Sequence, residues 1–94
     1  MKDNFKLKAR VSSSNPSAIQ PVLEKLMMQG SVTRAGEDFL VEAEMEGTNA
    51  EELNRALLSA LRRTEKRTRL RAEWTCGKIT ERFFDYVLKK TIRN

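Results

Sequence analysis

The segment from Thr48 to Thr75, TNAEELNRALLSALRRTEKRTRLRAEWT, constrains the fold most, because it joins a well-marked helix to an alternating strand through a short basic connection. Thr48 or Asn49 is placed to cap the helix, with Glu51 or Glu52 at the capping-box spacing. The predicted inner face of the helix carries Leu53, Leu57, Ala60, Leu61 and Thr64. The strand after it alternates inward Leu70, Ala72 and Trp74 with outward Arg69, Arg71 and Glu73. This segment therefore predicts a helix packed against a sheet whose other face is exposed to solvent.

The preceding residues supply the rest of that sheet. Phe5, Leu7, Ala9 and Val11 alternate with Lys6, Lys8 and Arg10, a period that predicts a first strand. Asn15 and Pro16 then mark a helix start, and Gly30 marks its end. The run from Ser31 to Gly47 predicts a hairpin, since a turn over residues 35–38 separates two apolar stretches. The predicted element order is β-α-β-β-α-β.

This order and these lengths resemble the ferredoxin-like fold over residues 4–75. The resemblance implies an α+β domain with a four-stranded antiparallel sheet, strand order 4-1-3-2, and two helices on one face. The C-terminal text RTRLRAEWTCGKITERFFDYVLKK also looks like small prokaryotic proteins of unassigned function. The run RALLSALRR resembles the second helix of the small dimerising subunit of the KEOPS tRNA-modifying complex. Neither similarity implies a site residue.

Residues 79–94 allow two interpretations as an extension of a single domain spanning residues 1–94. As a helix, the extension would be capped by Thr80, and Ile79 and Phe84 would form a hydrophobic staple. As a fifth strand, it would follow a turn at Gly77 and place Phe83 and Phe84 on opposite faces. The helix is favoured, because its polar residues gather on one side.

Charge is distributed unevenly over the 94 residues, whose net charge is +5. Residues 1–54 hold 6 Lys and Arg against 9 Asp and Glu, a net of −3, whereas residues 55–94 hold 12 against 4, a net of +8. Such a chain is one domain by size. We expect it in the cytoplasm, because it has one Cys, no apolar N-terminal run and no stretch of about 18 apolar residues.

The basic connection is the candidate site for a polyanion. Its six cations, opposed within the connection only by Glu65, are Arg62, Arg63, Lys66, Arg67, Arg69 and Arg71. Positive charge also suits the end of a helix, so a purely structural explanation stands beside the functional one. RNA-binding sheets stack bases on outward aromatic residues, and the three aromatic residues of the four predicted strands, Phe5, Phe39 and Trp74, all fall on the inward side.

Catalysis is not expected from this inventory of side chains. The chain has no His, a lone Cys76, and four Gly residues scattered at turns rather than in a phosphate-binding motif. Glu51 and Glu52 are explained as first-turn residues that complement the helix dipole. We therefore predict no enzyme, no cofactor and no metal site.

Two functions of different classes are expected. The first is a small non-catalytic interaction module that self-associates or docks a protein partner, because the short strand around Val32 would be a sheet edge with few charges beyond Arg34. The alternative is weak, sequence-independent binding of RNA or another polyanion through residues 62–71. No membrane partner is expected.

Overall fold

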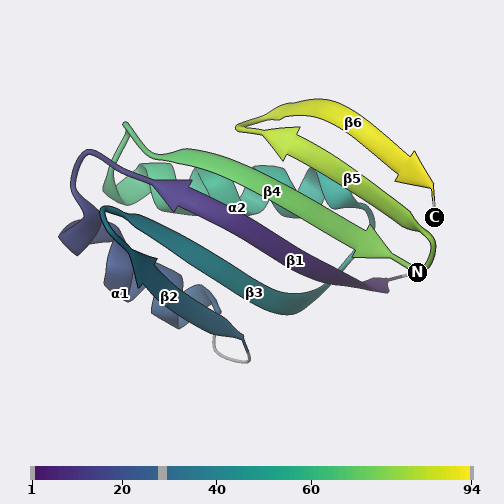
Figure 1. Cartoon of the computed structure of the whole chain (residues 1–94), viewed down its shortest axis with the longest axis horizontal. Coiled ribbons are helices and arrows are strands. Elements are labelled where there is room, and N and C mark those ends of the chain that lie inside the picture. The colour runs from purple at the N-terminus through teal and green to yellow at the C-terminus, as the bar shows by residue number, and fades with distance from the viewer. Residues whose placement is uncertain (1, 28–29, 94) are drawn as a thin grey trace.

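The computed structural model describes residues 2–27 and 30–93. Two helices and six strands alternate as β1 (Asp3–Ser12), α1 (Pro16–Leu26), β2 (Ser31–Ala35), β3 (Asp38–Gly47), α2 (Ala50–Thr64), β4 (Arg69–Cys76), β5 (Ile79–Phe84) and β6 (Val87–Arg93). The strands form one antiparallel sheet in the order β2-β3-β1-β4-β5-β6. Both helices lie behind the sheet in Figure 1, which leaves the other side, called here the open face, uncovered by helices.

The expected four-stranded ferredoxin-like sheet is wrong, because the sheet has six strands. The first four strands do keep the neighbour order that was expected for them. Two further strands extend the sheet beyond β4 (Figure 1). The chain is therefore an α+β protein in which two helices cover only part of a wider sheet.

The favoured C-terminal helix is also wrong, because residues 79–93 form the β5–β6 hairpin; residue 94 lies outside the described residues. One two-residue turn joins β4 to β5, and another joins β5 to β6. Each turn begins with a residue at positive φ, Gly77 (61°) and Asp85 (55°). Hairpin turns of this kind require positive φ because it matches the twist of the flanking strands. Phe83 and Phe84 consequently point to opposite faces, as the strand alternative required.

The core lies between the helices and the sheet. Inward residues of β1 and β3 alternate with exposed ones as predicted, and Leu7, Val11, Phe39 and Val41 are fully buried. Trp74 is buried to 1% exposure, as its predicted inward register requires. Helix α2 buries Leu57 and Leu61 as expected and adds Leu58, whereas Thr64 is exposed. Its cap is Asn49, whose side chain accepts a hydrogen bond from the Glu52 amide at 2.8 Å.

Neither helix in residues 2–27 and 30–93 combines the length and apolar character that a membrane span requires.

Candidate functional site

Phe84 is a large aromatic side chain on the open face. It lies in β5 opposite Arg71 of β4, whose side chain also faces away from the helices. The Phe84 side chain keeps 39% of its surface exposed. Phe5, Phe39 and Trp74 are buried, as predicted for the four expected strands. The prediction did not include Phe84, because residues 79–94 were favoured as a helix.

Two cations flank this ring. The guanidinium carbon of Arg71 lies 5.1 Å from the ring centre, and the Lys89 ammonium of β6 lies 6.0 Å from it. Both distances are within the range of cation–π attraction. We call Phe84, Arg71 and Lys89 the aromatic platform.

A hollow of about 360 Å³ adjoins the platform on the open face. Its floor is partly apolar, because Leu40 of β3 is 43% exposed there. Its full lining is Lys8, Ala9, Arg10, Leu40, Arg71, Ala72, Glu73, Arg82 and Phe84. The hollow thus offers apolar surface surrounded mostly by positive charge.

The cations of this hollow differ in how well they are neutralised. Arg10 is paired with Asp38 at 2.7 Å, and the Arg82 Nε donates to Glu73 at 2.8 Å. Arg71 stands directly opposite Arg10 across the strand pair, an arrangement of like charges that destabilises a sheet. In the part of the chain that the structure describes, no ion pair includes Arg69 or Arg71. These two cations remain available to an anionic ligand.

Asp38 is the carboxylate paired with Arg10. The hydrogen bond from Arg10 lowers the pKa of Asp38 below its usual value, with further lowering from Ser12 and from the charges of Arg10 and Arg71. A second hollow of about 260 Å³ is lined by Arg10, Ser12, Asp38, Arg69 and Arg71. Asp38 therefore remains ionised at neutral pH and offsets part of the positive potential at that end of the open face.

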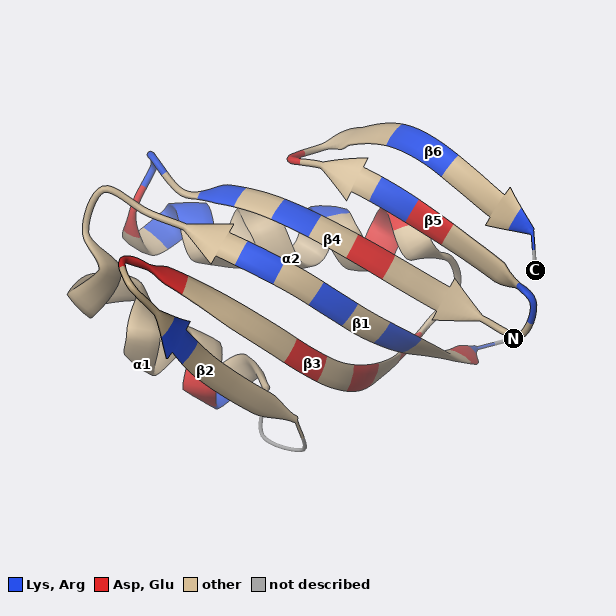
Figure 2. Cartoon of the chain, viewed as in Figure 1, with Lys and Arg blue, Asp and Glu red and all other residues tan. Residues whose placement is uncertain are grey.

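Positive charge occupies one half of the open face. Figure 2 shows Asp and Glu along β3, whereas Lys and Arg predominate on β1, β4 and β6; β4 also carries Glu73, and β5 carries Glu81 beside Arg82. Across the β1–β3 ladder, Lys6 stands opposite Glu44 and Lys8 opposite Glu42. Arg10 departs from that pattern, since it faces Leu40 and Arg71.

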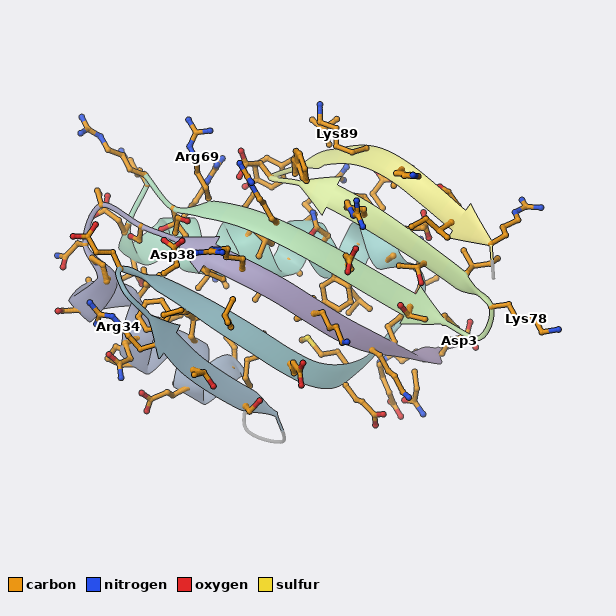
Figure 3. All side chains as sticks on the ribbon, viewed as in Figure 1. Asp3, Arg34, Asp38, Arg69, Lys78 and Lys89 are labelled. Atoms are coloured by element: carbon orange, nitrogen blue, oxygen red, sulfur yellow. The ribbon has the colours of Figure 1, made fainter. Side chains whose placement is uncertain are left out.

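The six cations of the predicted polyanion site fall into three places. Arg69 and Arg71 lie on the open face, and Figure 3 shows the side chain of Arg69 extending outward from β4. Arg63 is exposed in the last turn of α2. The other three, Arg62, Lys66 and Arg67, line a basic recess of about 400 Å³ together with Thr68, Arg69 and Asp85. Arg69 borders both the recess and the second hollow, so it connects the basic turn to the open face.

Arg62 has a structural position within this set. Its Nε donates to the Thr68 carbonyl at 2.9 Å, and its Nη2 lies 3.5 Å from Asp85 Oδ1. Its guanidinium carbon also lies 5.2 Å from the centre of the Tyr86 ring. Arg62 thus fastens the β5–β6 turn to α2, and less of its charge is free for a ligand.

A buried polar network holds the same turn from the core side. Trp74 Nε1 donates to Asn54 Oδ1 at 3.2 Å, and Asn54 Nδ2 donates to the Asp85 carbonyl at 2.6 Å. Asp85 in turn accepts from the Leu70 amide through Oδ1 at 3.0 Å. Sequence reasoning missed this network; the polar Asn54 at an inward-facing position of an apolar helix stripe was the available signal. The network fixes the turn that follows Phe84.

Within residues 2–27 and 30–93, no group of three or more Cys, Asp or Glu side chains gathers as a metal site would require. Cys76 is a free, half-buried thiol at the end of β4.

Comparisons of the chain with protein-family models, with curated proteins and with solved structures find no match.

Proposed function

We propose that the open face binds single-stranded nucleic acid, with an unpaired base stacked on Phe84. The observation that carries the proposal is the aromatic platform, an exposed ring with two cations at 5.1 Å and 6.0 Å from its centre. Proteins that bind single strands combine aromatic stacking with a basic track for the backbone, and stacking tolerates any base. The platform supplies the first element.

The second element is a line of cations that leads away from the ring. Arg71 and Arg69 are two residues apart on one strand, so their Cα atoms are spaced by about 7 Å. Arg69 also lines the basic recess with Lys66 and Arg67. A nucleic-acid backbone that follows this line contacts Arg71, then Arg69, then the basic recess. Five of the six predicted cations, all but Arg63, then form one surface with the platform.

The form of nucleic acid follows from the geometry of stacking. A duplex keeps its bases paired inside the helix, whereas a ring on a flat sheet requires a base that is free to leave its neighbours. The acidic residues of β3 border the basic half of the open face and repel phosphates (Figure 2). We therefore expect a short contact of a few nucleotides and modest affinity.

Fluorescence anisotropy with a labelled 12-nucleotide single strand and a duplex of the same sequence tests the proposal. Phe84→Ala should weaken single-strand binding about 5- to 150-fold, the range that one stacked base contributes. The control is Leu88→Ala, an exposed apolar residue of the same hairpin that pairs with inward-facing Phe83 and so lies on the opposite side of the sheet. Equal affinities of the wild type and Phe84→Ala, or preferred binding of the duplex, would contradict stacking.

The interaction module expected from the sequence is a second candidate function. The observation that favours it is the difference in charge and pairing between the two edge strands, β2 and β6. These edges are a different surface from the aromatic platform.

A further inference from the structure

The sheet has two edge strands, β2 and β6, with very different chemistry. Strand β6 carries Lys89, Lys90 and Arg93, and its register with β5 shifts at residues 82–83, so that Lys89 is the extra residue of a β-bulge. Lysine side chains and bulges are the devices by which edge strands avoid pairing with other chains. Strand β6 is therefore a guarded edge.

Strand β2 has no such guard. Its sequence is SVTRA, with Arg34 as the single charged residue. The Arg34 side chain folds back on its own hairpin, since its Nε donates to the Gly36 carbonyl at 2.9 Å and its guanidinium carbon lies 5.2 Å from the Phe39 ring centre. No lysine, proline or bulge interrupts its pairing with β3. Within residues 2–27 and 30–93, no strand pairs with the outer side of β2, so its backbone groups there can pair with another strand.

We propose that two copies of this chain pair through β2 in an antiparallel, two-fold arrangement that joins their sheets. Charge favours β2 over β6 as the edge where two copies can pair. Two molecules of net charge +5 repel each other, and β2 lies farthest from the cationic strands, beside β3 with its glutamates. In the joined sheet, β4 of one copy is seven strand spacings from β4 of the other, about 34 Å, well beyond the screening length of about 8 to 10 Å.

The side chains of β2 are compatible with self-pairing. A two-fold axis at Thr33 places each Thr33 opposite its equivalent, Val32 opposite Arg34, and Ser31 opposite Ala35. Threonine pairs stabilise antiparallel strands, and the small residues at the ends let the backbones approach. Five residues form a small contact, so we expect a dissociation constant on the order of 100 µM, as for interfaces below the standard size.

Disulfide trapping tests both the edge and the register. In a Cys76→Ser background, Thr33→Cys should give a covalent dimer in a glutathione redox buffer, because residues paired across antiparallel strands lie within disulfide reach. The matched control is Thr91→Cys, an exposed threonine on β6. Dimer formation by Thr33→Cys alone supports the proposal. A covalent dimer from Thr91→Cys alone, or from neither variant, overturns it.

Sedimentation velocity of the full chain between 10 µM and 1 mM gives an independent measurement. The wild type and Thr91→Lys should shift toward a dimer at high concentration, whereas Thr33→Lys should stay monomeric because two ammonium groups would meet at the axis. Matching unfolding midpoints for the three proteins exclude misfolding as the cause. A wild type that is monomeric at 1 mM, or a dimer that Thr33→Lys leaves intact, overturns the proposal.

Discussion

Asn54 links three elements through its side-chain amide alone. It accepts from the Trp74 indole, donates to the Asp85 carbonyl and is itself only 1% exposed. A buried donor or acceptor that loses its partner retains the full cost of its desolvation. The amide therefore contributes to stability mainly through the partners that it satisfies.

We predict that Asn54→Ala lowers the free energy of unfolding by about 2 to 4 kcal/mol, because the Trp74 N–H and the Asp85 carbonyl both lose their partner. Urea unfolding followed by Trp74 fluorescence measures the change. Ala56 is an exposed position on the same helix, so Ala56→Ser should change stability by under about 0.5 kcal/mol. A similar small effect for Asn54→Ala would show that water replaces the amide.

At the scale of elements, the β5–β6 hairpin depends on two adjacent phenylalanines with opposite surroundings. Phe83 is 1% exposed within the core, and Phe84 lies on the open face. We predict that Phe83→Ala lowers the free energy of unfolding by about 3 to 5 kcal/mol, and Phe84→Ala by under about 1 kcal/mol. Thermal unfolding by circular dichroism compares the two. Equal costs would contradict the alternation of the hairpin.

Local pattern predicted the first 76 residues of the fold well, because β1, β3 and β4 alternate strictly and each helix begins at a cap or a proline. The same pattern did not predict the β5–β6 hairpin at residues 79–93. The gathering of polar residues on one side suggested a helix. Phe83 faces inward because it stands opposite the buried Ala72 of β4, a pairing between strands that sequence periodicity does not show. The hairpin turn at Asp85 depends on Asn54 and Leu70, residues 31 and 15 positions away.

The candidate site was predictable only in its charges. The six cations were evident from their density, and the direction of Arg69 and Arg71 followed from alternation. The ring that adds an aromatic surface to this charge comes from β5, and a strand was the less favoured of the two interpretations of residues 79–94. Arg62 was expected to serve the same surface, but it packs against Tyr86 and bonds the Thr68 carbonyl.

For the whole molecule, the division of charge should govern binding. We predict that the affinity for a single strand falls steeply with salt. Reversing Arg69 and Arg71 to Glu should reduce the magnitude of the slope of log affinity against log salt by about 1.4, or 0.7 for each lost phosphate contact. The comparison variant reverses Arg63 and Arg67, of which only Arg67 borders the recess. Its slope should fall by about 0.7. Slopes that do not change in either variant would place the phosphates elsewhere.

The guarded edge at β6 has a consequence for the size of any assembly. A sheet with two adhesive edges can add copies without limit and grows into a fibre, since each added copy presents the edge that the next one needs. Here the lysines and the bulge of β6 leave one edge repellent, so growth by strand addition terminates once β2 is occupied. The cations of β6, which also add positive charge to the open face, therefore prevent further strand addition. The chain can pair through β2 and still form an assembly of limited size.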